Sequence, residues 1–215
     1  RRHGWQIRRE EVLCTTGVVP AVSAVIKAFT RPGDGVALMT PAYNCFFSSI
    51  RNNGCFAAET SLLMGDAGWT IDFAALEKTL ADPRVKVLLF CSPHNPVSRV
   101  WTKEELEKVG DICLKHNVLV VSDEIHADFV FKGKHQVFVA IKKEYEDITM
   151  TCTAPSKTFN LAGLALSNIF IPNRKLKHRF KAELSAAGTN LLGVMGLVAC
   201  QTAYEKGEEW YCAMK

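Results

Sequence analysis

The sequence predicts an α/β protein, built as a three-layer α/β/α sandwich around a mostly parallel central sheet. Short apolar runs rich in Val, Ile and Leu alternate with longer amphipathic stretches along the 215 residues, as in chains whose strands are joined by helical crossovers. The runs Val85–Cys91 and Val118–Ser122 are almost continuously apolar, which is typical of strands covered on both faces. Hydrophobic residues make up 48% of the chain and charged residues 22%, a balance that allows a packed core.

The predicted elements alternate from the first strand to the last helix. Short apolar runs predict strands at Val36–Met39, Gly54–Glu59, Val85–Cys91, Val118–Ser122, Ile148–Cys152 and Leu166–Ile171. Amphipathic stretches predict helices at Pro20–Phe29, Tyr43–Asn52, Asp72–Leu80, Lys103–His116 and from about Asn190 to Glu205. Thr102 and Glu105 form a capping-box pattern before one helix, and the segment Arg31–Gly35 combines a proline with glycines as a turn does.

Charge and cysteine usage exclude several classes of protein. The formal net charge of +4 is too small to indicate a nucleic-acid partner. The densest basic stretch, Arg174–Lys181, is interpreted as a solvated helix start, with an anion-binding patch as the alternative. The eight cysteines occur singly and never with CxxC spacing, so no zinc ribbon or other metal site is predicted. Unpaired cysteines of this kind favour reduced thiols and a cytoplasmic location.

Neither a membrane span nor a signal peptide is expected. The longest uninterrupted apolar run, Leu191–Cys200, is shorter than the roughly 20 residues that a transmembrane helix needs, and the first residues lead into no apolar stretch. The sequence has no initiator Met, and Lys215 follows a helical pattern without a stop signal. We therefore expect the sequence to be part of a longer protein.

The turn after the first apolar run is a candidate anion site. In an open α/β sheet, ligands bind beyond the carboxyl ends of the strands, so the polar residues at those ends deserve inspection. The segment Thr15–Pro20 follows the run that ends at Cys14. Gly17 allows the backbone to approach a ligand, and free N–H groups at Val18 and Val19 would favour an anion such as phosphate. An ordinary strand-to-helix turn is the alternative.

Two further strand ends carry polar residues that could bind a ligand. Asn95 lies between two prolines in Ser92–Pro96, which restrict its backbone and direct its amide; a rigid loop is the alternative. Asp123 directly follows the apolar run Val118–Ser122, where a carboxylate is destabilised by desolvation unless it meets a cation. An ion pair or a helix cap is the alternative there. His126 is a further candidate, although a histidine in such a place is more often structural.

Lys157 follows the predicted strand Ile148–Cys152, within the segment Ala154–Asn160. Partial burial among small and apolar residues would favour the neutral, nucleophilic amine that Schiff-base chemistry needs; a solvated surface lysine is the alternative. An anion-binding turn, an amide, a buried carboxylate and an amine on successive strand ends match the requirements of pyridoxal 5'-phosphate (PLP). Tyr43 could stack its ring on the pyridine of this cofactor.

With these residues in place, the chain resembles the fold-type-I PLP enzymes, the aspartate-aminotransferase superfamily, over essentially its whole length. The resemblance lies in the sequence motifs TTGVVPA, TPAYNCFF, SPHNPVSRVW, VVSDEIHADFVF and APSKTFNLAGL. The last three are most similar to the cystathionine β-lyase branch, which includes the cystalysin-like C–S lyases. The resemblance implies the large-domain fold of the PLP-dependent transferases.

The same resemblance implies a role for each candidate residue. Lys157 would carry PLP as a Schiff base, Asp123 would pair with the pyridinium nitrogen, and Asn95 would bind the phenolic oxygen. Tyr43 would stack on the ring, and His126 would also contribute to cofactor binding.

The phosphate-binding part of the site departs from the family pattern. The Gly17–Val19 backbone would hold the phosphate with help from Ser156. Many aminotransferases add an arginine at the positions where this chain has Ala165–Leu166, and its absence fits the lyase branch better. The family also commonly has asparagine where this chain has Ser92, and Thr-Gly where it has Val97–Ser98.

The resemblance also implies how the whole protein is organised. Residues 1–189 would form the large PLP-binding domain, and residues 190–215 a long helix leading toward a small C-terminal domain that is absent from this chain. The arginine that binds the substrate carboxylate is expected in that domain, so this chain alone would bind PLP yet lack a complete substrate site. The full-length protein is expected to be a homodimer.

The function that these expectations favour is α,β-elimination from a sulfur amino acid. Cystathionine, cysteine or a similar small substrate would yield a thiol, pyruvate and ammonia. A class I/II aminotransferase is the nearest alternative, and a PLP-binding regulatory or interaction domain with little catalysis is the alternative from another class.

Overall fold

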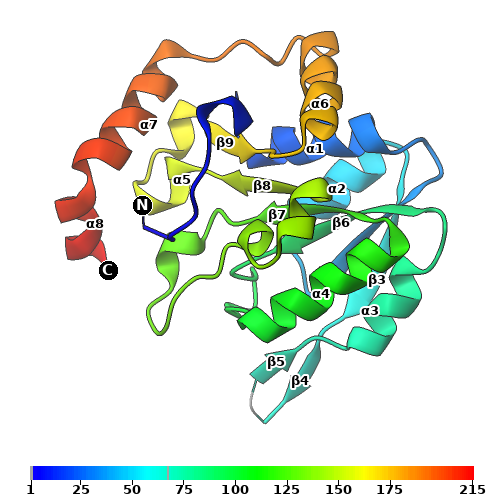
Figure 1. Ribbon diagram of the computed structural model, residues 1–215. Coiled ribbons are helices and arrows are strands. Elements are labelled where there is room, and N and C mark those ends of the chain that lie inside the picture. Colours follow the sequence, from blue (N-terminus) through cyan, green and yellow to red (C-terminus); the bar gives the residue numbers. More distant parts are fainter. Residues whose placement is uncertain (1, 67) are drawn as a thin grey trace.

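A seven-stranded mixed sheet forms the centre of the computed structural model, which describes residues 2–66 and 68–215 (Figure 1). The strands lie in the order β1-β9-β8-β7-β6-β2-β3. Their bounds are Val12–Thr15 (β1), Gly35–Thr40 (β2), Phe56–Ser61 (β3), Val85–Cys91 (β6), Leu119–Asp123 (β7), Thr149–Thr153 (β8) and Ser167–Phe170 (β9). Strands β3, β2, β6, β7 and β8 pair in parallel, whereas β9 is antiparallel to both of its neighbours. The predicted mostly parallel sheet is confirmed.

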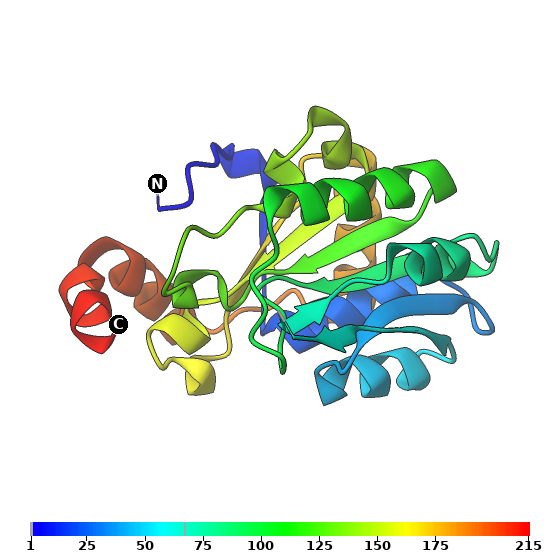
Figure 2. The same ribbon diagram turned by 90° about the horizontal axis from the view of Figure 1, so that it is seen from below.

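Helices cover both faces of this sheet, which confirms the predicted three layers. The α-helices are Val18–Phe29 (α1), Asn44–Asn52 (α2), Phe73–Leu80 (α3), Lys103–His116 (α4), Pro155–Thr158 (α5), Arg174–Ala186 (α6), Val194–Lys206 (α7) and Glu208–Met214 (α8). The 3-10 helices are Arg9–Glu11 (η1), Ala127–Phe129 (η2), Phe138–Ala140 (η3), Lys143–Asp147 (η4) and Ala162–Leu164 (η5). Helices α1, α2 and α6 pack on one face, and α3 and α4 on the other; Figure 2 shows α1 and α4 on opposite sides of the strands.

The strands divide their side chains between two hydrophobic cores. In β2, Val36 and Leu38 join the core under α1, whereas Ala37 and Met39 join the core under α4. Successive side chains of a strand point to opposite faces of the sheet, so a strand buried on both faces has no polar side. This is why β2, β6 and β7 read as continuous apolar runs in the sequence.

Strand β9, the last strand in the sequence, runs antiparallel to β8, a direction that the helix–strand alternation did not predict. The chain leaves β8 at the carboxyl edge, forms α5 and η5 there, and enters β9 without crossing back over the sheet. A parallel strand requires a crossover that returns to the starting edge. Because that crossover is missing, β9 must run antiparallel to β8.

Other elements differ from the predicted bounds for local reasons. Strand β3 begins at Phe56 because Gly54 adopts φ +73° in a turn. Helix α7 begins at Val194, later than the predicted Asn190, with Gly193 as its N-cap. The hairpin of β4 (Leu63–Gly65) and β5 (Gly68–Thr70) was not predicted, because β4 is exposed and the three-residue β5 is too short to show an alternating core-facing pattern.

The basic stretch that the sequence placed at a helix start does begin α6. The Asn173 side chain caps this helix by accepting hydrogen bonds from the Lys175 and Leu176 N–H groups at 2.9 and 3.2 Å.

Within the part of the chain that the structure describes, no helix is both long enough and apolar enough to cross a bilayer.

The packing of η4 on α4 depends on a glycine. The Tyr145 ring is fully buried and stacks on Phe138 with ring centroids 5.4 Å apart. Its hydroxyl lies 2.8 Å from the Glu107 carbonyl oxygen and 2.9 Å from Asp111 Oδ1. A Cβ atom at Gly110 would lie only 2.2 Å from Cζ of this ring, so the position admits no side chain without moving Tyr145.

We predict that Gly110→Ala destabilises the protein, although alanine is the better helix former by about 1 kcal/mol. The clash with Tyr145 should lower the free energy of unfolding by about 2–3 kcal/mol in urea denaturation. The double variant Gly110→Ala/Tyr145→Leu is the control, because the shorter side chain removes the clash. A single variant as stable as the parent would contradict this account of the packing.

Candidate active site

Strands β6, β7 and β8 bring the predicted site residues to one edge of the sheet. The register places Asp123 beside Cys91 on one side and beside Cys152 on the other. Asn95 follows Cys91, and Lys157 follows Cys152, each after a short segment. Because these strands are parallel, their carboxyl ends meet at the same edge, where α/β proteins bind ligands.

Asp123 is a buried carboxylate without an ion-pair partner among the described residues. Its side chain lies at the end of β7 with 5% of the residue exposed, and Oδ1 accepts a hydrogen bond from the Ile125 N–H at 3.2 Å. Within residues 2–66 and 68–215, no lysine, arginine or histidine forms an ion pair with it. Burial raises the pKa of Asp123 to about 7, against the opposing effects of the Ile125 hydrogen bond and the Lys157 charge.

The anion-binding turn predicted from the sequence lies where β1 passes into α1. Gly17 is the N-cap of α1 with φ +148°, a value that side-chain-bearing residues rarely adopt. Among the described residues, no side chain caps this helix, so the first N–H groups, including those of Val18 and Val19, have no side-chain acceptor. The Thr15 hydroxyl holds the turn by donating to the Gly17 carbonyl oxygen at 3.0 Å. A helix start of this kind favours an anion.

A histidine links the loops that carry Asn95 and Tyr43. His94 is 3% exposed, and its Nε2 donates to the Pro41 carbonyl oxygen at 2.9 Å. Burial lowers the pKa of His94, so the neutral ring is favoured. Asn95 is half-buried, whereas Tyr43 is exposed at the N-cap of α2. The prediction singled out Asn95 in this loop and missed the contact of the preceding histidine.

Lys157 lies in the one-turn helix α5 and is exposed. The sequence had led us to expect partial burial, and this expectation was wrong for the described chain. The residues around Lys157 do not bury its side chain. Thr158 and Phe159 are themselves buried, whereas Ser156 is only half-buried. Successive side chains of a helix point in different directions, so Lys157 is exposed while the adjacent Thr158 is buried.

His126 and Asn95 line one groove of about 370 Å³ beside this edge. Val100, Phe129 and Phe131 form much of its apolar wall. Asp123, Lys157 and Tyr43 do not line it, so the groove brings together only part of the predicted set. The pKa of His126 is lowered by burial and, to a smaller extent, by the charge of Lys157.

The acidic residues on either side of His126 have structural partners that the sequence did not reveal. Glu124 is buried with His135, and Glu124 Oε2 lies 2.6 Å from His135 Nε2. Asp128 accepts a hydrogen bond from Thr158, the residue after Lys157, at 2.8 Å. The sequence shows that Thr158 follows Lys157, but it does not show that Asp128 accepts a hydrogen bond from Thr158.

The positions where the chain departs from the family pattern have clear local structure. The N–H of Ser92 donates to the Asp123 carbonyl oxygen at 2.9 Å, so this residue continues the sheet pairing. Ser98 adopts φ +56° in the loop that Arg99 closes by accepting from the His94 N–H at 2.8 Å. Ala165 is exposed at φ +47°.

Together these residues offer three chemical functions at one edge of the sheet. A helix start can bind an anion, a buried carboxylate can accept a cation, and an accessible amine can react with a carbonyl group.

The chain is similar to solved and curated C–S lyases over nearly its whole length. It is 43% identical over 210 residues to cystathionine beta-lyase PatB of Bacillus subtilis, covering 97% of this chain and 54% of that protein. Its structure matches the crystal structure of cystalysin from Treponema denticola, which contains a pyridoxal 5'-phosphate cofactor. The TM-score is 0.96 at 45% identity, covering 99% of this chain and 54% of that one.

A third structure supports the same relationship. The PLP-bound C–S lyase from Staphylococcus hominis matches with a TM-score of 0.91 at 32% identity, over 99% of this chain and 54% of that one. The chain thus spans about half the length of these relatives. The family model for aminotransferase class I and II matches residues 1–188. The resemblance that the sequence motifs indicated is therefore confirmed: this chain belongs to the aminotransferase class I and II family.

Proposed function

We propose that this protein is a PLP-dependent C–S β-lyase that cleaves cystathionine, cysteine or a similar sulfur amino acid. The observation that carries the proposal is the buried, cation-free carboxylate of Asp123 at the same sheet edge as the accessible amine of Lys157. The names of the relatives support the choice of reaction, since PatB is a cystathionine beta-lyase and the Staphylococcus hominis protein is a C–S lyase.

The residues of this edge fit PLP in chemical terms. Asp123 requires a cation, and a protonated pyridine nitrogen is one. The start of α1, including Gly17, Val18 and Val19, is suited to the phosphate, with the Ser156 hydroxyl as a further donor.

The remaining contacts would orient the pyridine ring. Asn95 would donate from its amide to the phenolic oxygen, and Tyr43 would pack its ring against the pyridine. His126 would contribute beside Asn95, with which it shares a groove.

PLP bound at this edge would supply an electron-withdrawing group that makes the proton on the substrate Cα more acidic. Lys157 would then remove the Cα proton with its freed Nζ amine. Asp123 would keep the proton on the ring nitrogen, because a carboxylate buried beside that nitrogen favours its charged form. The Cβ–S bond breaks and the thiol leaves. For cystathionine and one water, the balanced products are homocysteine, pyruvate and ammonia.

The proposal includes the organisation of the whole protein. Residues 1–189 would form the large cofactor-binding domain, and residues 190–215 would lead toward a smaller domain that carries an arginine for the substrate carboxylate. The protein would act as a cytoplasmic homodimer on small amino acids, without nucleic acid or membrane partners. The family description also names aminotransferases, which share the proton removal at Cα and differ in where the proton returns.

The products formed without an amino acceptor distinguish these activities. We expect the PLP-loaded full-length protein to release pyruvate, ammonia and homocysteine in equal amounts from cystathionine when no 2-oxo acid is added. Lactate dehydrogenase coupling and a thiol reagent would measure the first and last of these. Turnover that requires an added 2-oxo acid would instead indicate an aminotransferase. Cofactor binding without turnover would indicate a regulatory or interaction domain.

Lys157→Ala should abolish covalent attachment of PLP, because it removes the amine after β8 that would form the Schiff base. The visible Schiff-base absorption and the pyridoxyl label left by borohydride reduction should both disappear. Lys175→Ala is the matched control, since Lys175 is also exposed but lies on α6. A pyridoxyl label that persists in Lys157→Ala would contradict the assignment of Lys157 as the residue that binds PLP covalently.

Asp123→Asn should abolish PLP binding yet stabilise the cofactor-free protein at high pH. The pKa of Asp123 is about 7 in the folded chain, against an ordinary value of 3.8. The folded state therefore binds a proton that the unfolded state has released between these values, and stability falls as the pH rises from about 4 to about 7. At pH 8 the variant should unfold with a free energy roughly 1–3 kcal/mol higher than the parent.

Urea unfolding of the cofactor-free proteins at pH 5 and pH 8 measures this difference. Asp66→Asn, on the exposed hairpin turn, is the control and should keep the pH dependence of the parent. A parent whose stability does not change over this range would show that Asp123 is not buried as described.

A further inference from the structure

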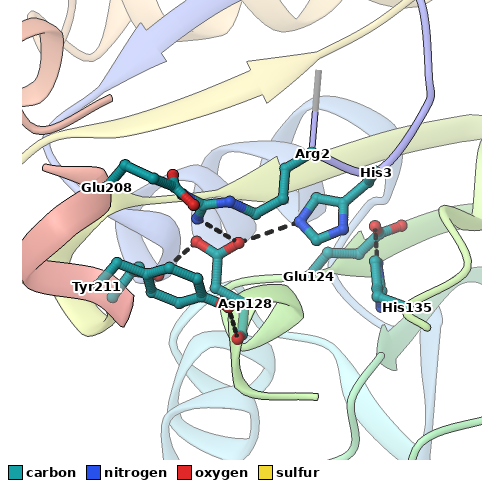
Figure 3. Close-up of polar contacts among 8 residues, drawn as sticks. Arg2, His3, Glu124, Asp128, His135, Glu208 and Tyr211 are labelled. Atoms are coloured by element: carbon teal, nitrogen blue, oxygen red, sulfur yellow. Dashed lines mark hydrogen bonds and ion pairs between the residues drawn. The ribbon is translucent and has the colours of Figure 1, made fainter. Parts of the chain in front are cut away.

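Asp128 gathers hydrogen-bond donors from three distant parts of the chain (Figure 3). Its carboxylate lies 2.9 Å from Arg2 Nη1 and 3.1 Å from His3 Nε2, both through Oδ1. Its other oxygen, Oδ2, accepts from the Thr158 hydroxyl at 2.8 Å. The hydroxyl of Tyr211 in α8 donates to the Asp128 carbonyl oxygen at 2.7 Å. The residue therefore connects both ends of the described chain to α5.

The carboxylate is mostly buried and carries its charge because of these donors. The side chain of Asp128 is 11% exposed. Burial by itself would raise the pKa of Asp128, but the hydrogen bonds from His3, Arg2 and Thr158 outweigh it and lower the pKa to about 2. Charge-assisted hydrogen bonds of this kind are short and strong, so the partners are held in defined positions.

The contact with Thr158 matters because α5 is too short to hold itself. The helix spans Pro155–Thr158 only, and isolated helices of this length are unstable in water. Thr158 is 2% exposed and directly follows Lys157. Its side chain is thus the buried, hydrogen-bonded anchor next to an exposed lysine.

Arg2 and residues of α8 contact each other next to Asp128. The Arg2 guanidinium also lies 4.1 Å from the centre of the Tyr211 ring and forms an ion pair with Glu208. Arg2 and Tyr211 therefore contact each other as well as Asp128, and the three residues form one connected group. Loss of Arg2 and His3 would remove two donors from the Asp128 carboxylate, and loss of Tyr211 would remove the donor to the Asp128 backbone carbonyl oxygen.

We propose that Asp128 is a positioning residue that orients Lys157 through Thr158 and couples that orientation to Arg2, His3 and helix α8. The proposal rests on the proposed function, because it concerns the lysine that would carry PLP. Asp128 itself need not touch substrate or cofactor. Its effect passes through the anchor of α5.

Thr158→Val, Asp128→Asn and Tyr211→Phe test the proposal in the same protein that is used for the PLP measurements. Thr158→Val removes the hydroxyl that donates to Asp128 while keeping the shape of the side chain, and Thr158→Ser restores it. Tyr211→Phe removes only the bond to the Asp128 carbonyl oxygen. Asp111→Asn is the matched control, because Asp111 also accepts from a tyrosine hydroxyl and a lysine but lies on α4.

The readouts are the dissociation constant for PLP, the midpoint pH of the lysine-linked visible band, and the thermal unfolding midpoint. We expect Thr158→Val and Asp128→Asn to weaken PLP binding about tenfold and to shift the midpoint pH of the band, with a smaller change in Tyr211→Phe. Thr158→Ser and Asp111→Asn should match the parent in both. A shift in the midpoint pH of the band reports on the lysine itself, because a general loss of stability would not change that midpoint.

Two results would overturn the proposal. If Thr158→Val lowers the thermal midpoint but keeps the PLP affinity and the band of the parent, the contact only stabilises the fold. If the parent shows no lysine-linked band, the proposed function fails first and this inference fails with it. Should Asp128→Asn not fold, Thr158→Val and Tyr211→Phe decide the matter alone.

Discussion

The burial of the Asp123 carboxylate at the end of a central strand is the constraint on which the site depends. Helices on both faces of the sheet exclude water from β7, so the strand can end in a carboxylate only at a cost in desolvation. The described chain supplies one backbone hydrogen bond and no cation in return. Under the proposed function, the cationic ring nitrogen of PLP would compensate this carboxylate, and the neighbouring strands would supply the other groups that contact the cofactor.

Parallel strand order is what makes this delivery possible. Strands β6, β7 and β8 end at the same edge, so loops that are far apart in sequence lie side by side there. The short path through α5 and η5 then reverses the chain into β9 rather than carrying it across the sheet. Lys157 therefore stays at the edge, on a segment too short to be rigid without outside support.

Two aspartates five positions apart show how environment assigns different tasks to one side chain. Burial raises the pKa of Asp123 to about 7, whereas three hydrogen-bond donors lower the pKa of Asp128 to about 2. Environments that push the pKa values of similar groups apart commonly separate chemical from structural roles. Here Asp123 lies at the sheet edge without an ion-pair partner among the described residues, whereas Asp128 accepts a hydrogen bond from Thr158 of α5.

Local patterns in the sequence were sufficient to predict the main strands and helices of the sheet layers and to place candidate residues at the strand ends. The continuous apolar runs of β6 and β7, the glycine at the start of α1, and Asp123 and Lys157 directly after strands all follow from spacing and residue type. Only the tertiary structure decided that β9 runs antiparallel, that Lys157 is exposed, and that Arg2, Thr158 and Tyr211 converge on Asp128. The reason is physical: periodicity records which side of an element is buried, whereas contacts between chain ends and loops depend on how the elements pack.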